Sequence, residues 1–208
     1  MVHDEGVPLR KTLIFILMLS SMVIYAQPLS SNFHWPMGNG YGKDIKITSP
    51  FGDRKDVILP GAKQGGDDSS FHFALDMIPK DGSYKNVPIY AAQDGIVVDV
   101  WPPKGGKFRG HPVFGGCMLI KHEIEILGER VYAYTFYAHL KEVFVSEGTR
   151  ISQNTMIGIM GNTGMSTGAH LHFEIRFNPM DFLYSSDRYV DRPRLYLPQT
   201  TNIQIGVE

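Results

Sequence analysis

The chain has 208 residues, of which 43% are hydrophobic and 20% are charged, a composition that excludes wholesale disorder and suits one globular domain. Lys and Arg number 20 and Asp and Glu number 21, so the formal net charge of -1 gives no global attraction to nucleic acid or anionic lipid. A single cysteine, Cys117, excludes an internal disulfide and a zinc site built from several thiolates.

The N-terminal residues 1–26 have the pattern of a secretory signal peptide. Arg10 and Lys11 precede an apolar run from Thr12 to Tyr25, and Ala26 supplies a small residue at the expected cleavage point. The run is shorter than the roughly 20 residues of a membrane-spanning helix. A buried apolar strand or helix is the alternative. We expect a secreted or periplasmic protein that has no stable membrane insertion after signal cleavage.

Short strand-like runs separated by turns follow from Asp44 onward, and no stretch keeps helical periodicity for three turns. The 22 glycines and 13 prolines favour turns between short strands. We therefore expect a mostly β fold with a single antiparallel β-sheet domain. The predicted strands are Ile45–Thr48, Pro88–Ala91, Gly95–Trp101, Met118–His122, Arg130–Tyr137, Met156–Met160 and His170–Phe177.

The expected domain occupies residues 44–180. Residues 27–43 have the composition of a leader or linker, and residues 181–208 that of a C-terminal tail. Two glycine-rich loops, 59–70 and 102–116, are either binding loops carried by the sheet or simple connections.

Strict alternation of polar and apolar residues marks the segment from His170 to Phe177. On a strand, side chains two apart share a face, so Leu171, Phe173 and Ile175 are expected to point into a core. His170 and His172 then share the opposite face, with Cα atoms about 7 Å apart. Such a pair can place one or both imidazoles on a metal, although a polar strand face also produces it by chance.

A second segment places His72 and Asp76 four residues apart, a spacing that puts both on one face of a strand or of a helix. Imidazole nitrogen and carboxylate oxygen suit zinc, and three protein ligands with an open position are the catalytic pattern. A solvated histidine and a capping aspartate in a turn are the alternative. A third segment ends an aromatic strand with His139, which in isolation is equally well a surface residue.

Taken together and in order, these segments resemble the lysostaphin/LytM-type zinc metallopeptidases. The resemblance extends from about Ile47 to Ile175. The segments that carry it are Ser49–Arg54, His72 with Asp76, Val87–Val97, Tyr137–Leu140, Glu147–Gly158 and Gly161–Ile175.

The resemblance implies a zinc cofactor held by His72, Asp76 and His172, with His139 and His170 as catalytic residues beside the open position. It also implies a substrate groove along the sheet with the metal on its floor. His170 is the expected general base, and His139 is expected to stabilise or protonate the tetrahedral intermediate, although these two roles could be exchanged.

The activity implied is that of an exported zinc metalloendopeptidase, a peptidoglycan hydrolase that cuts peptide bonds in cross-links or stem peptides of the cell wall. Glycyl-glycine and D-alanyl cross-links both remain open, and so does the oligomeric state. One alternative is a non-enzymatic peptidoglycan-binding or hydrolase-activating module on the same fold, against which the complete set of five residues counts. The other is a cupin-type barrel, in which the ligands that follow a His-x-His strand lie downstream rather than upstream.

The remaining candidates receive structural interpretations. We expect His122 to make a structural hydrogen bond, His111 to belong to a loop, and Cys117 to behave as a small buried hydrophobe.

Overall fold

The computed structural model describes residues 33–40, 43–53, 71–103, 110–126, 128–177, 190–191 and 196–198. Within these ranges the chain forms strands and no helix. The strands are β1 (Ile45–Ser49), β2 (Gly52–Asp53), β3 (Phe71–His72), β4 (Leu75–Pro79), β5 (Pro88–Tyr90), β6 (Gly95–Trp101), β7 (Gly116–Ile126), β8 (Glu129–Val143), β9 (Arg150–Ile151), β10 (Met156–Met160), β11 (Leu171–Arg176) and β12 (Val190–Asp191).

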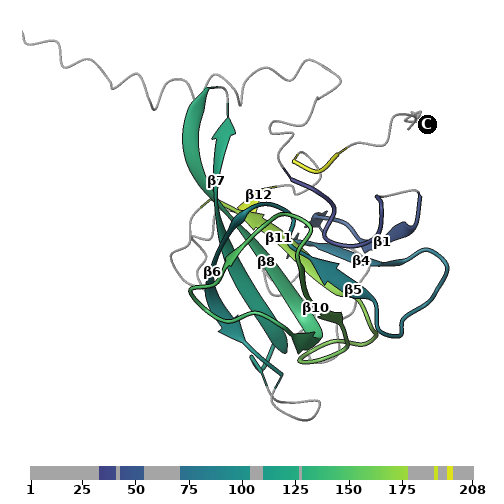
Figure 1. Ribbon diagram of the computed structural model, residues 1–208. Coiled ribbons are helices and arrows are strands. Elements are labelled where there is room, and N and C mark those ends of the chain that lie inside the picture. The colour runs from purple at the N-terminus through teal and green to yellow at the C-terminus, as the bar shows by residue number, and fades with distance from the viewer. Residues whose placement is uncertain are drawn as a thin grey trace, which may run out of the picture.

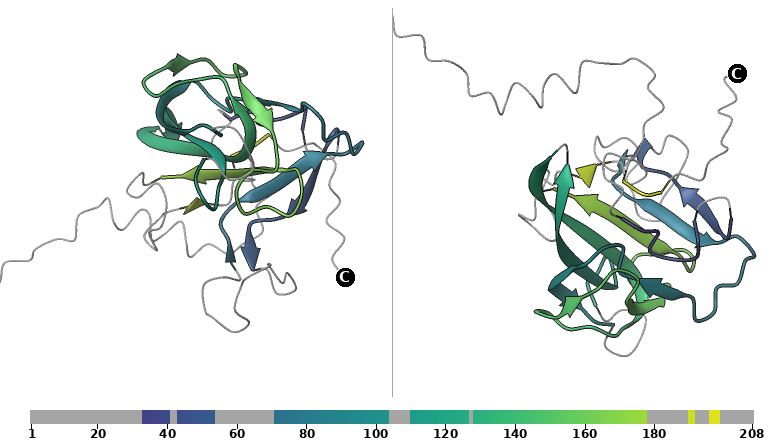
Figure 2. Two further views of the ribbon diagram at one scale, coloured as in Figure 1. Left: turned by 90° about the horizontal axis from the view of Figure 1, so that it is seen from below. Right: turned by 45° about the horizontal axis from the view of Figure 1, so that its top comes forward.

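Ten of these strands form one sheet with the order β1-β4-β11-β8-β7-β6-β9, while β5, β10 and β12 pair beside this path and β2 pairs with β3. The pairings within the sheet are antiparallel, which confirms the predicted mostly β fold with a single antiparallel sheet. Figure 1 shows β11 between β4 and β8 near the middle of the molecule. Seen from below, β11 separates the β6–β8 part from the β1–β4 part (Figure 2).

The sheet buries side chains on both faces. Leu171, Phe173 and Ile175 of β11 are fully buried in the larger apolar cluster, as their alternation predicts. A smaller cluster on the opposite face contains Phe136 and Ala138 of β8. Because β8 and β11 are neighbours in the middle of the sheet, both of their faces are covered. The histidine face of β11 therefore lies in a largely apolar setting rather than in open solvent.

The predicted strands at β6 and β10 have the observed bounds, whereas β7 and β8 are longer than the hydrophobic runs indicate. Their hairpin continues beyond the body of the sheet (Figure 1), where burial no longer dictates apolar residues. Glu123 and Arg130 pair there across the hairpin at 2.9 Å. Strand β4 was not predicted, because its second residue, Asp76, interrupts an otherwise apolar run.

Residues that flank the expected domain also pack on it. Phe33, Trp35 and Met37 are buried in the larger cluster, and the Trp35 indole Nε1 donates to the Pro198 carbonyl at 3.0 Å. Tyr196 and Leu197 complete this contact.

The signal peptide predicted for residues 1–26 and the loop predicted for 59–70 lie outside the described residues. Only residues 102–103 and 110–116 of the second glycine-rich loop belong to the described part. Among the described residues, no helix has the length and hydropathy needed to cross a membrane.

Candidate metal centre

Three side chains from three strands converge near the middle of the sheet. His72 ends β3, Asp76 lies in β4 and His172 lies in β11, and their ligand-type atoms all lie within 4.8 Å of one another. The pairing of β4 with β11 sets Asp76 directly opposite His172 and so brings together residues that are far apart in the sequence. The spacing of His72 and Asp76 suggested that they share one strand or one helix. In the structure they belong to two strands separated by a two-residue break.

The Asp76 carboxylate is the focus of this group. Its Oδ1 lies 3.1 Å from His72 Nε2, 3.2 Å from His172 Nδ1 and 3.6 Å from His170 Nε2. Burial by itself would raise the pKa of Asp76, but the adjacent His172 and His72 imidazoles outweigh it and hold the pKa well below its usual range. The centre therefore presents one anionic oxygen among imidazole nitrogens.

His72 provides the clearest evidence that the group suits a metal. Its Nδ1 lies 3.0 Å from the Pro50 carbonyl oxygen and 3.1 Å from Ser49 Oγ. Donation from Nδ1 to the carbonyl leaves Nε2 without a proton and facing Asp76. Nε2 is buried and has no hydrogen-bond partner among the described residues. A cation bound between this nitrogen and the Asp76 carboxylate would satisfy both atoms, and two nitrogens with one oxygen are a donor set that zinc accepts.

His170 and His139 lie beside this group. His170 Nδ1 lies 2.8 Å from the Gly168 carbonyl, and His139 Nδ1 lies 2.8 Å from the Thr163 carbonyl. The two ring centroids are 4.6 Å apart. Because each ring donates from Nδ1 to a backbone carbonyl, each keeps an unprotonated Nε2. The structure thus brings together all five residues that the sequence singled out.

A β-bulge turns His139 to the metal face. Tyr137 and Leu140 both belong to the larger cluster although they are three residues apart, and there β8 takes three residue steps where β7 takes two. His139 has a φ of 62°, in the left-handed region, and its backbone N–H donates to the Phe114 carbonyl at 2.8 Å. Regular alternation would instead place this imidazole in the larger cluster. The sequence suggested that His139 ends its strand, but His139 lies within β8.

Burial keeps both flanking histidines neutral. It lowers the pKa of His139 to about 3, an effect that the neighbouring His172 and His170 increase. It also lowers the pKa of His170. Both imidazoles are therefore in the basic form at neutral pH and can accept a proton at Nε2.

Two further side chains support His172, and the sequence reasoning gave them no role. The Glu174 carboxylate lies with Oε1 2.9 Å from His172 Nε2, and its Oε2 accepts from Arg176 Nε at 2.8 Å. Both residues are buried. The available signal was the continued alternation of His172, Glu174 and Arg176 along one strand, because charged residues on a central strand need buried partners.

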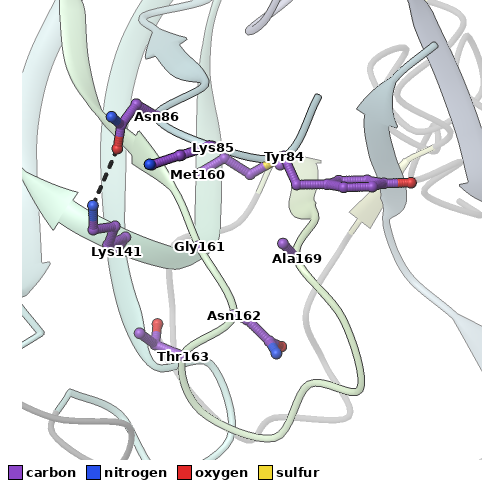
Figure 3. A pocket seen from close by; sticks show the side chains of 9 residues that line it. All are labelled: Tyr84, Lys85, Asn86, Lys141, Met160, Gly161, Asn162, Thr163 and Ala169. Atoms are coloured by element: carbon purple, nitrogen blue, oxygen red, sulfur yellow. Dashed lines mark hydrogen bonds between the residues drawn. The ribbon is translucent and has the colours of Figure 1, made fainter. Parts of the chain in front are cut away.

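A pocket of about 490 Å³ borders the centre (Figure 3). None of the five residues of the centre lines this pocket. Its Ala169 packs against the larger cluster, whereas the adjacent His170 faces Asp76. In Figure 3 the Lys141 ammonium donates to Asn86 across one side of the pocket, at 3.1 Å. Two pocket residues hold the flanking histidines: the Thr163 carbonyl accepts from His139 Nδ1, and the Gly161 carbonyl accepts from the His170 backbone N–H at 3.1 Å.

The remaining histidine expectations agree with the structure. His122 is buried, with Nδ1 2.8 Å from the Asp94 carbonyl and Nε2 2.7 Å from Thr135 Oγ1. His111 stacks on Phe114 in its loop, with ring centroids 5.2 Å apart. Cys117 is fully buried, and burial raises the pKa of its thiol.

A family comparison agrees with this geometry. Residues 70–182 match the model of peptidase family M23, a range that includes all five residues of the centre and covers more than half of the chain. The chain belongs to peptidase family M23. Peptidases of this family are zinc-dependent metallopeptidases, so zinc is the cofactor that the His72, Asp76 and His172 group fits.

Curated relatives of this M23 chain include two named enzymes. It is 30% identical over 130 residues to the peptidoglycan DD-endopeptidase ShyA of Vibrio cholerae serotype O1, a match covering 62% of this chain and 24% of ShyA. It is 32% identical over 133 residues to the DD-carboxypeptidase/endopeptidase Mpg of Neisseria meningitidis serogroup B, covering 64% of this chain and 25% of Mpg. The chain thus spans about a quarter of the length of these relatives.

Among solved structures, one chain of the SpoIIIAH and SpoIIQ complex matches with a TM-score of 0.53 and 23% identity. The match covers 78% of this chain and 98% of that chain. At this identity the likeness shows the fold alone.

Proposed function

We propose that this M23 chain is an exported zinc-dependent endopeptidase that hydrolyses peptide bonds in peptidoglycan cross-links or stem peptides. The observation that carries the proposal is the convergence of His72, Asp76 and His172 on one point, with His139 and His170 beside it in their basic forms. Peptidoglycan is the proposed substrate because the similar protein ShyA is named a peptidoglycan DD-endopeptidase, and Mpg, named a DD-carboxypeptidase/endopeptidase, agrees with cleavage of a peptide bond.

The metal ligands in this proposal are His72 Nε2, Asp76 Oδ1 and His172 Nδ1. Zinc held by these three residues would supply a Lewis acid for the scissile carbonyl and would lower the pKa of its bound water towards about 7. The Pro50 carbonyl accepts from His72 Nδ1 and so fixes the tautomer of His72. The buried Nε2 of His72 then needs no rearrangement to act as a ligand.

The two flanking histidines move the protons. His170 Nε2 lies 3.6 Å from the Asp76 carboxylate and its side chain retains 17% exposure, so it is the first acceptor of a proton from the attacking water. His139 is more deeply buried and is held by Thr163, so it is suited to stabilise the tetrahedral intermediate or to protonate the leaving amine. The imidazole that has accepted the proton becomes the acid that returns it to that amine.

Digestion of purified peptidoglycan tests the proposal directly. The full chain is incubated with sacculi with and without a zinc chelator, and the released peptides are identified by mass spectrometry. We expect peptides whose release stops with chelator and resumes when zinc is restored. Their termini would reveal which bond is cut. Sacculus binding without any released peptide would instead support the non-enzymatic module.

Export is tested separately. We expect the protein outside the cytoplasm of its native host, with a mature N-terminus near Gln27. N-terminal sequencing of the native protein checks this, and retention of residues 1–26 would contradict the signal peptide.

A further inference from the structure

A buried ion pair lies behind the metal centre on β11. Glu174 and Arg176, here called the β11 ion pair, have relative exposures of 0% and 1%. One Glu174 oxygen lies 2.9 Å from His172 Nε2, and the other accepts from Arg176 Nε at 2.8 Å. Both carboxylate oxygens are therefore engaged, one towards His172 and one towards Arg176.

The surroundings of this pair are apolar. Glu174 is opposite Phe136 in β8, and the Arg176 guanidinium lies over the Phe136 ring at 4.3 Å from its centroid. The smaller apolar cluster on this face includes Phe136 and Leu119. Replacing a buried ion pair by well-packed apolar residues is often neutral or favourable for stability. A charged pair in this place therefore calls for an explanation other than stability.

We infer that Glu174 and Arg176 are positioning residues that fix which nitrogen of His172 faces the metal. The inference rests on the proposed function in that His172 acts as a zinc ligand. A neutral imidazole carries one N–H. With the Glu174 carboxylate beside Nε2, the proton resides on Nε2 and the Nδ1 lone pair faces Asp76, 3.2 Å away.

The opposite tautomer is the state that Glu174 disfavours. With its proton on Nδ1, His172 would donate to the Asp76 carboxylate and offer no lone pair to a metal. Asp76 alone favours that tautomer, so a second carboxylate on the far side of the ring is needed to oppose it. Arg176 keeps the Glu174 carboxylate charged and oriented towards Nε2, because a guanidinium is always protonated and binds carboxylates strongly.

Two variants test the inference. In Glu174→Gln the amide oxygen is expected to accept from Arg176, which turns the amide NH2 towards His172 Nε2 and forces the proton to Nδ1. The double variant Glu174→Leu with Arg176→Met removes both charges and keeps an apolar interior. Leu119→Ala is the matched control, because it perturbs the same apolar cluster without changing the ion pair.

Zinc affinity is the first readout, measured by chelator competition on the full chain. We expect both ion-pair variants to bind zinc about 10–100-fold more weakly, the usual loss when a partner of a metal-binding histidine is removed. Leu119→Ala should stay within about twofold of the wild type once it is shown to be folded. Wild-type affinity in both ion-pair variants would overturn the inference.

The tautomer of His172 is the second readout and requires no activity. Nitrogen-15 NMR of the zinc-free protein at alkaline pH should show the proton on Nε2 in the wild type and on Nδ1 in Glu174→Gln. An unchanged Nε2–H form in Glu174→Gln would overturn the inference. Should the double variant fail to fold, Glu174→Gln preserves the side-chain size and still provides both readings. Absence of peptidoglycan cleavage by the wild type, with both readings as expected, would reject the proposed function and retain the role of the ion pair.

Discussion

Two histidines of the same sheet, one partly buried and one fully buried, show how partners decide the chemistry of an imidazole. His172 in β11 lies between two carboxylates, whereas His122 in β7 lies between a backbone carbonyl and a hydroxyl. Burial tends to lower the pKa of both rings, but the hydrogen bonds of Asp76 and Glu174 with His172 reverse the shift and raise its pKa. One ring is therefore suited to face a cation, while the other serves as a neutral element of the packed interior.

The largest effect is expected on the carboxylate-flanked histidine. His172→Ala removes one of three ligands and should reduce zinc content well below one per chain, with loss of peptide release greater than the upper limit of about 10⁴-fold for a missing general base. Metal analysis of the purified variant beside the wild type is the measurement. Undiminished zinc in a folded His172→Ala protein would show that His172 is not a ligand.

The flanking histidines should separate metal binding from turnover. His170→Ala leaves the three ligands in place, so zinc content should stay near one per chain while turnover falls by about 10²–10⁴-fold. His139→Ala should resemble His170→Ala. Zinc content measured together with the rate of peptide release distinguishes the cases. Loss of zinc from His170→Ala comparable to that from His172→Ala would show that His170 is a ligand. Near-normal activity of His170→Ala would show that His170 has no catalytic role.

The different origins of these residues explain what the sequence could predict. The alternation of β11 follows from its pleat, so the core side chains Leu171, Phe173 and Ile175 could be read directly from the pattern. The order of the motifs likewise identified the residues that converge. The opposition of His172 and Asp76, by contrast, depends on the register between β4 and β11, which no local pattern contains.

Other features had no local signal. The bulge that turns His139 to the metal face is one extra residue in β8, and its position depends on the pairing with β7. The alternation of β11 places Glu174 and Arg176 on the histidine face, but their pairing follows only from the burial of that face in the folded sheet. Single-strand periodicity thus predicts which face a residue occupies, and strand pairing decides what it meets there.

The two faces of β11 should also separate in their response to truncation. Phe173→Ala creates a cavity in the larger apolar cluster and should lower the free energy of unfolding by about 3–5 kcal/mol. The zinc content of the folded fraction should remain near one per chain, because no ligand is altered. Urea unfolding and metal analysis of the same preparation check both statements. Loss of zinc from a folded Phe173→Ala protein would show that the two faces are not independent.

The smallest effect concerns the pH dependence of the second buried histidine. Burial lowers the pKa of His122 from 6.5 to about 4 in the folded chain. Between these two pKa values His122 binds a proton in the unfolded chain but not in the folded chain. The contribution of His122 to the free energy of unfolding is therefore fully present above pH 6.5 and is lost as the pH falls towards 4. The difference between the two pKa values corresponds to about 3 kcal/mol in the free energy of unfolding.

Comparison with His122→Gln isolates this contribution from other acid-sensitive groups. The variant lacks the titrating ring, so its stability deficit relative to the wild type should shrink by about 3 kcal/mol between pH 7.5 and pH 4. Urea unfolding at each pH is the measurement. His34→Gln, which replaces an exposed histidine, is measured in parallel as the matched control. If the stability deficit of His122→Gln stays constant between pH 7.5 and pH 4, His122 is protonated in the folded chain as readily as in the unfolded chain. The contrast between His122 and His172 would then not depend on burial among neutral partners.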